Sequence, residues 1–183
     1  GCTFVENDLI NALEDNLDES IDLGFVHASY DSFKSKSESG YERAHEFYAK
    51  HLADIDEVKQ LLNESEGCEG IVSIPILGIK NSVEEFASAN GITAGIFLNA
   101  TFAYTYSRFL CSDKVYFNFT EHGRHEDYAR NAVGMFTRTV PILVDCKNDF
   151  IKEYLSYFSD LALSSMLNDV YPFRMLASEF NLN

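Results

Sequence analysis

The 183-residue chain has no tryptophan, only three prolines and no apolar run near the roughly 20 residues that a transmembrane helix requires. Basic residues are scarce, since 14 Lys and Arg stand against 29 Asp and Glu, for a formal net charge of −15. Nucleic acids and anionic membranes both select basic surfaces. We therefore expect neither nucleic acid nor membrane as a partner, and we expect a cytoplasmic protein.

Paired cysteines are also missing. The four cysteines stand far apart and none forms a CxxC pair, which favours free thiols in a reducing compartment over a disulfide framework or a zinc site. His122 and His125 share one segment, but a zinc site needs two further ligands that the segment does not offer. We therefore expect no metal. The cysteines are Cys2, Cys68, Cys111 and Cys146.

What is present is a large apolar fraction, 46% hydrophobic and 14% aromatic, enough for one packed domain over residues 1–183. Hydrophobic periodicity predicts helices and strands in alternation, and it leaves the acidic stretch before Ser39 as an exposed connection. The pattern is typical of an α/β fold, an α+β sandwich in which helices are layered on a mixed sheet. The predicted helices cover 4–17, 41–52, 83–90, 93–110, 148–166 and a short segment after Pro172, and the predicted strands cover 71–79, 115–120 and 136–144.

The loop after the strand at 115–120 carries the most informative polar residues. Gly123 permits a backbone turn that other residues avoid. Arg124 can either orient a carboxylate or hold the loop down by hydrogen bonds. The sequence contains no GxSxG elbow, no GxGxxG fingerprint and no phosphate-binding loop. The residues alone therefore indicate an α/β lobe with one polar, conformationally demanding loop.

Four segments, in order, resemble the condensation domains of nonribosomal peptide synthetases. Residues 40–52 resemble the helix that precedes the family's second lobe, and His122 to Glu126 resemble its GR element. Val133-Gly-Met-Phe-Thr-Arg-Thr-Val-Pro141 resembles the motif VGxFVNTxP, and Asn168-Asp-Val-Tyr-Pro-Phe173 resembles (H/N)QDYPFE. The resemblance implies a chloramphenicol-acetyltransferase-like fold.

The chain departs from these motifs at several positions. Arg138 stands in place of the asparagine of VNT, and Asp169-Val170 stands in place of Gln-Asp. The family's active-site motif HHxxxDG is absent, and no His-His pair occurs. The resemblance therefore implies that the catalytic histidine lies upstream, that residues 1–183 are the C-terminal lobe cut at both ends, and that this fragment is inactive alone.

For the intact enzyme, the resemblance implies peptide-bond formation between an acyl thioester and an aminoacyl amine. Both substrates are held on the phosphopantetheine arms of carrier proteins, so this lobe itself binds no cofactor. The implied partners are carrier proteins, the N-terminal lobe and an adenylation domain. The resemblance assigns the tunnel floor to Gly134, Met135, Phe136, Arg138 and Thr139, and a bridging loop to Gly123 and Arg124.

Three alternatives stay open. Glu121-His-Gly-Arg124 and Val133-Gly-Met-Phe-Thr137 also resemble motifs of epimerisation domains, which share the fold. A stand-alone acyltransferase of the same superfamily is the second alternative, and a non-catalytic interaction lobe is the third. For any of them, Gly134→Val is predicted to distort the floor turn by denying the backbone room.

Overall fold

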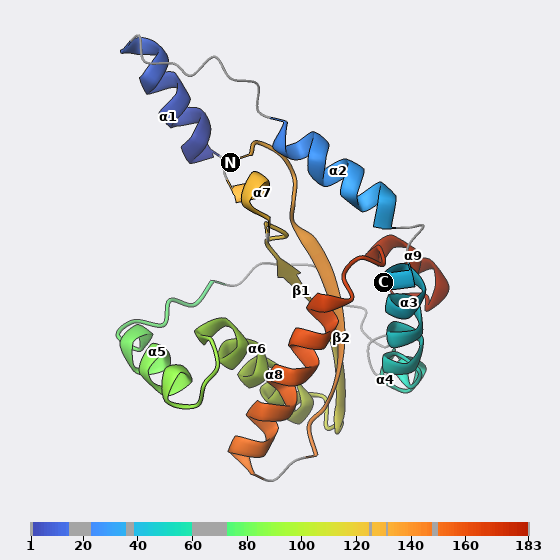
Figure 1. Cartoon of the computed structure of the whole chain (residues 1–183). Coiled ribbons are helices and arrows are strands. Elements are labelled where there is room, and N and C mark those ends of the chain that lie inside the picture. Colours follow the sequence, from blue (N-terminus) through green and yellow to red (C-terminus); the bar gives the residue numbers. More distant parts are fainter. Residues whose placement is uncertain are drawn as a thin grey trace.

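The computed structural model describes residues 2–14, 23–35, 39–59, 73–124, 126–130, 132–147 and 150–182. Within these ranges, helices lie on both sides of two long strands (Figure 1). The helices are α1 (Cys2–Leu13), α2 (Gly24–Ser35), α3 (Ser39–His51), α4 (Ile55–Lys59), α5 (Lys80–Ala89), α6 (Ala94–Phe109), α7 (Asp127–Arg130), α8 (Ile151–Leu167) and α9 (Phe173–Glu179). The strands are β1 (Lys114–Glu121) and β2 (Arg138–Asp145).

The two strands pair antiparallel, with Lys114 opposite Asp145 and Glu121 opposite Arg138. The α/β class is confirmed, whereas the sheet of the described residues is antiparallel instead of mixed. The strand predicted at 71–79 is wrong for its described part, because residues 73–77 have no regular structure. Pro75 removes a backbone donor there, and the side chains of Ile74 and Leu77 are 76% and 86% exposed.

One face of the sheet packs against α6 and α8. Alternation along β1 and β2 points Val115, Val140 and Val144 toward these helices, where all three are fully buried. The small residues Ala100 and Ala103 of α6 are also fully buried and form a small-residue face of this helix. Close packing of helix on strand is the main source of stability on this side.

The opposite face packs against α3, α4 and α9 (Figure 1). Tyr48 and Leu52 of α3 meet Tyr116 and Leu143 of the sheet in a second apolar cluster. The Tyr48 hydroxyl donates to the carbonyl of Ser165 at 2.9 Å, so α3 is also tied to the end of α8. The sheet is therefore the middle layer of a helix–sheet–helix sandwich.

Three predicted boundaries need correction. The stretch before Ser39 contains a helix, α2, in place of an exposed connection. The helix predicted at 83–90 begins at Lys80. The helix predicted at 4–17 ends at Leu13, and residues 15–17 lie outside the described ranges.

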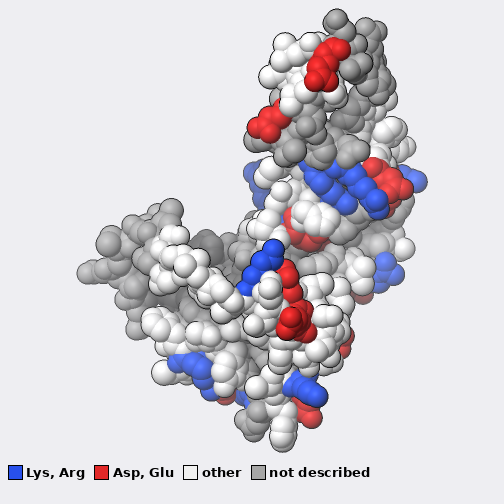
Figure 2. Space-filling model, turned by 90° about the vertical axis from the view of Figure 1, so that its left-hand side faces the viewer, with Lys and Arg blue, Asp and Glu red and all other residues white. Residues whose placement is uncertain are grey.

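Charged side chains occur in small groups of both signs. On the face seen in Figure 2, basic and acidic groups of the described residues lie next to each other. Elsewhere on the molecule, Lys114 pairs with Asp54 and Glu57, at nitrogen–oxygen distances of 2.6 Å and 3.2 Å. None of the described helices is long and apolar enough to cross a membrane.

Candidate functional site

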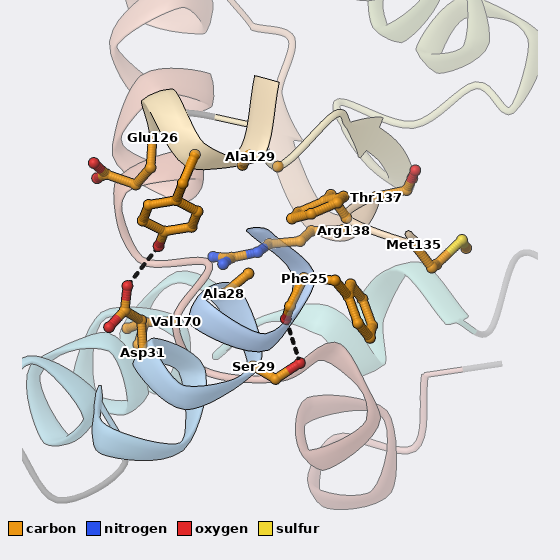
Figure 3. Close-up of a pocket in the computed structure, with 13 residues that line it drawn as sticks. Phe25, Ala28, Ser29, Asp31, Glu126, Ala129, Met135, Thr137, Arg138 and Val170 are labelled. Carbon is orange, nitrogen blue, oxygen red and sulfur yellow. Dashed lines mark hydrogen bonds between the residues drawn. The ribbon is translucent and has the colours of Figure 1, made fainter. Parts of the chain in front are cut away.

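A pocket of about 460 Å³ opens at the end of the sheet where β1 finishes and β2 begins. Helix α2 covers it from one side and α7 from the other, and the residues that lead into β2 form its floor (Figure 3). Its lining mixes aromatic, thioether, hydroxyl and charged groups. The lining residues are Phe25, Ala28, Ser29, Asp31, Gly123, Glu126, Tyr128, Ala129, Met135, Phe136, Thr137, Arg138 and Val170.

Gly123 forms the turn that brings the loop onto the floor. Its φ of +65° lies in the left-handed region, as predicted for a turn that other residues avoid. A Cβ at this position would lie 1.9 Å from the carbonyl oxygen of Phe136. The Gly123 N–H donates to the carboxylate of Glu121, which is itself buried. The turn therefore requires glycine on two grounds, backbone angle and lack of space.

Arg124 fastens the loop and the floor together. Its guanidinium donates to the carbonyls of Ala129, of Ala132 at 2.8 Å and of Gly134 at 3.2 Å. The same group lies 4.1 Å from the centre of the Phe136 ring. Of the two uses considered for Arg124, this geometry supports the structural one, because the guanidinium is already bonded to three carbonyls.

Gly134 allows α2 to pack against the floor of the pocket. A Cβ at Gly134 would lie 2.3 Å from a ring carbon of Phe25, which belongs to α2. The Phe25 ring in turn meets the Phe136 ring edge-on at 5.7 Å between centroids. The absence of a side chain at Gly134 therefore lets an aromatic residue of α2 pack directly on the floor backbone.

Arg138 links the floor to the turn after α8. One guanidinium nitrogen lies 2.5 Å from the Asp169 carboxylate, whose side chain is only 11% exposed. In Figure 3 the Arg138 side chain runs across the pocket toward the side that holds Asp31. Arg138 and Asp169 are two of the positions at which the chain departs from the family's motifs, and the structure brings them into contact.

A second polar contact closes the pocket between α2 and α7. The Tyr128 hydroxyl donates to the Asp31 carboxylate. This hydrogen bond, assisted by burial, raises the pKa of Tyr128 to about 12. The phenol therefore stays protonated at neutral pH and holds α7 to α2 as a donor.

The structure brings together most of the residues expected at the floor. Gly123, Met135, Phe136 and Arg138 line the pocket, Gly134 borders it through Phe25, and Arg124 supports it through carbonyl groups. Thr139 is exposed opposite Thr120, and it is not among the lining residues. Helix α2 was not predicted from the sequence, in which its one signal is the spacing of Phe25 and Ala28.

His122 and His51 accept structural hydrogen bonds from backbone N–H groups. The His122 ring accepts a hydrogen bond from the Arg124 N–H at 2.9 Å, and His125 lies outside the described residues. His51 accepts the Leu143 N–H at 3.0 Å, and burial lowers its pKa to about 4. Cys111 and Cys146 are free thiols, and no metal-binding cluster occurs in the described part of the chain.

The chain is similar to known proteins in both sequence and structure. Residues 17–183 match the condensation domain family. Surfactin synthase subunit 1 of Bacillus subtilis (strain 168) is 24% identical over 170 residues, covering 88% of this chain and 5% of that protein. The first condensation domain of the calcium-dependent antibiotic synthetase aligns with a TM-score of 0.74 and 16% identity, over 94% of this chain and 42% of that one. VibH, a nonribosomal peptide synthetase condensation enzyme, gives a TM-score of 0.68 and 16% identity, with the same coverage of 94% and 42%.

The chain therefore belongs to the condensation domain family. It spans 42% of the solved condensation domain named first above and 5% of surfactin synthase subunit 1. The similarity to the solved structures supports the predicted chloramphenicol-acetyltransferase-like fold.

Proposed function

We propose that this chain is one lobe of a condensation domain that joins a carrier-bound acyl thioester to a carrier-bound aminoacyl amine. The observation that carries the proposal is the family match over residues 17–183. The coverage of 42% of a solved condensation domain supports the assignment of a single lobe. No adjacent histidine pair occurs in this sequence, so the proposal places the catalytic histidine in the remainder of the domain.

The pocket between α2, α7 and the floor is proposed as this lobe's share of the substrate passage. A pantetheine arm is a chain of amides and methylenes, so it needs both hydrogen-bonding and apolar contacts. Met135 and Thr137 offer these at the exposed surface of the floor, and Phe136 lies buried beneath them. The arm would arrive on a partner carrier protein, and the lobe would orient it and exclude water without itself taking up a proton.

Arg138 is proposed as a positioning residue of this floor. Its guanidinium is held by Asp169, so the ion pair fixes the start of β2 against the turn that leads to α9. In the family motifs both positions are neutral amides, Asn and Gln. An ion pair in their place keeps the two segments in contact and brings a cation to the pocket wall.

The proposed partners are carrier proteins, an adenylation domain and the remainder of the condensation domain. The last of these fits the exposed apolar residues of α1, where Leu9 and Leu13 are 62% and 79% exposed. Apolar surface of this kind is typical of a contact with another protein surface.

The test is a condensation assay on the full-length polypeptide, with donor and acceptor carrier proteins loaded with their thioesters. Formation of the dipeptidyl thioester on the acceptor carrier supports the proposal. Inversion of the acceptor aminoacyl centre without dipeptide would replace it with epimerisation. Loaded carriers that remain unchanged would contradict catalysis and favour an interaction lobe.

A further inference from the structure

A second hollow lies at the other end of β2 from the candidate site. Its volume is about 390 Å³, and it is bounded by α3, by the end of β2 and by α8. The candidate site lies at Arg138, where β2 begins, and this hollow lies at Asp145, where β2 ends. The proposed substrate passage makes no use of it. The lining residues are Phe47, Lys50, His51, Asp54, Lys114, Leu143, Asp145 and Tyr157.

The backbone of β2 fixes the hydrogen-bonding roles of two of these side chains. The Nε2 atom of His51 accepts the Leu143 N–H at 3.0 Å, and burial lowers the pKa of this ring to about 4, so the ring is neutral at pH 7. A neutral imidazole that accepts through one nitrogen carries its proton on the other, so Nδ1 of His51 is a donor. The Tyr157 hydroxyl accepts the Asp145 N–H at 3.2 Å and keeps its own hydrogen, because burial raises the pKa of this phenol.

Three donors of the hollow are unused in the described part of the chain. Among these residues, neither the Nδ1–H of His51 nor the hydroxyl hydrogen of Tyr157 has an acceptor, and the Lys50 ammonium forms no ion pair. The Nδ1 atom of His51 is not sealed off from the surface, so a ligand can reach it.

The carboxylates of the hollow, in contrast, are already engaged. The Asp54 carboxylate lies 2.6 Å from Nζ of Lys114, which Glu57 also contacts at 3.2 Å. The Asp145 carboxylate accepts the Lys147 N–H at 3.0 Å. Two lysines and two aspartates line the hollow, so their formal charges cancel and do not oppose the entry of an anion.

An apolar wall accompanies the donors. The Phe47 ring stacks on the His51 ring at 5.6 Å between centroids, and the buried Leu143 lines the same hollow. A carboxylate only accepts hydrogen bonds, and its negative charge strengthens them. Small-molecule sites commonly join a few converging polar groups to an apolar wall in a volume of this size. The hollow therefore suits an anionic head group on an apolar body.

We propose that the hollow around His51 binds a small carboxylic acid with an aromatic or branched aliphatic body. The carboxylate accepts from the Nδ1–H of His51 and from the Tyr157 hydroxyl, with Lys50 as the neighbouring cation. The body of the acid lies against Phe47 and Leu143. The site is separate from the substrate passage, and the inference does not depend on the proposed function.

Titration with benzoate tests the site in the 183-residue chain. The expected result is a saturable change in the ¹H–¹⁵N NMR signals of the His51 ring and of the Leu143 amide, because both lie at the carboxylate. Benzylammonium and benzyl alcohol have the same ring without the anionic head group, and they should bind at least about tenfold more weakly. The absence of a saturable change with benzoate would overturn the proposal. Benzylammonium that binds as tightly as benzoate would also overturn it, since the aspartates would then govern the site.

Two variants remove the donors one at a time. Tyr157→Phe should weaken benzoate binding by about tenfold, whereas Tyr106→Phe, at a tyrosine of α6 that does not line the hollow, should not. Tyr157→Phe also takes the acceptor from the Asp145 N–H, so Lys50→Gln, at an exposed side chain, is the second variant. Lys50→Gln should weaken binding by about threefold, whereas Lys152→Gln, on α8 away from the lining residues, should leave it unchanged. Wild-type affinity in both Tyr157→Phe and Lys50→Gln would contradict the site.

The complete condensation domain distinguishes a free acid from an internal occupant. Benzoate should bind that domain with the affinity that it has for the 183-residue chain. Loss of binding in the complete domain would overturn the proposal, because the remainder of the domain would then fill the hollow. Binding is measured without carrier proteins, so a protein that binds benzoate but makes no dipeptide would contradict only the proposed function.

Discussion

The two regions of this molecule are held together in different ways. The helix–sheet–helix sandwich rests on apolar burial, with Val115, Val140 and Phe158 at 0% exposure. The pocket end rests on individual contacts: the Gly123 turn, the carbonyl bonds of Arg124 and the Arg138–Asp169 pair. Apolar burial is spread over many contacts, so a conservative change in the sandwich is shared among neighbours. At the pocket end, each of these contacts depends on one or two residues, so a single substitution can remove it.

Substitutions at the candidate site should therefore act differently from substitutions in the sandwich. A site built from single polar contacts on a rigid support is sensitive to changes that leave the core intact. The predictions that follow therefore compare a change at the pocket with a matched change elsewhere.

The largest effect is expected for Gly123→Ala. The new methyl group would meet the Phe136 carbonyl at 1.9 Å, and the φ of +65° would add backbone strain. We expect a loss of more than about 3 kcal/mol in the free energy of unfolding, measured by denaturant titration. Gly91→Ala is the control, because Gly91 has a φ of +70° but open space around its Cβ position. It should cost only about 1 kcal/mol, and equal losses in the two variants would contradict the tight contact at Gly123.

The sandwich should show a pH dependence that arises from His51. Burial lowers the pKa of His51 from 6.5 to about 4, so the native state resists a proton that the unfolded state takes up. Stability from this residue is therefore complete above pH 6.5 and is lost as pH falls toward 4, by about 3 kcal/mol. The charged or titratable groups that line the hollow around His51 are Lys50, Asp54, Lys114, Asp145 and Tyr157.

The measurement compares unfolding at pH 7 and pH 4.5 for the wild type and His51→Gln, which keeps an acceptor for the Leu143 N–H. The variant should lose much less stability over this range. His45→Gln, at a partly exposed histidine beside Glu179, is the control for removing a histidine elsewhere. A wild-type slope unchanged by His51→Gln would show that other groups cause the acid sensitivity.

A smaller, pairwise effect is expected between Arg138 and Asp169. Arg138→Asn leaves a nearly buried carboxylate without its ion-pair partner, and Asp169→Gln leaves the guanidinium without its own. The double variant restores two neutral amides, as in the family motifs. A double-mutant cycle should give a coupling free energy of about 1 kcal/mol, a modest value because Arg138 is 40% exposed. Strictly additive single effects would contradict the pairing.

The smallest effect on global stability is expected for Gly134→Val. The side chain added at Gly134 would meet the ring of Phe25, and because Phe25 is 44% exposed its ring can shift toward solvent. The cost should stay below about 1 kcal/mol. Helix α2 should nevertheless detach from the floor, which limited proteolysis within residues 23–35 would detect. Unchanged proteolysis of α2 would contradict the role assigned to Gly134.

The sequence predicted the sandwich well, because its elements have strong local periodicity. The small-residue face of α6 and the alternation of β1 both follow directly from spacing in the chain. The strand predicted over 71–79 was wrong for residues 73–77, since an apolar run with Pro75 does not become a strand without a neighbouring strand to bond. Periodicity indicates which side chains are buried, but it does not indicate which backbone segments have a partner strand for hydrogen bonding.

The site was predictable only in part. Motif resemblance located Gly123, Met135, Phe136 and Arg138, all of which line the pocket. It did not predict α2. Phe25 of this helix contacts the floor residue Phe136, and Asp31 accepts a hydrogen bond from Tyr128 of α7. Each contact joins residues about a hundred positions apart in the sequence. Motif resemblance also did not show that Arg138 and Asp169, noted separately as departures from two motifs, form one ion pair. Contacts between distant segments of this kind have no local signature.

The most direct test of the proposed substrate passage is to measure the rate of condensation after a large side chain has been placed in the pocket. Met135 lines the pocket and is 79% exposed, so Met135→Trp in the complete domain should leave the fold intact and obstruct the passage. Leu167→Trp is the control, at an 82% exposed position that ends α8 away from the lining residues. The account predicts that Met135→Trp slows dipeptidyl thioester formation by about tenfold or more while Leu167→Trp does not. An unchanged rate for Met135→Trp would contradict the claim that substrate passes through this pocket.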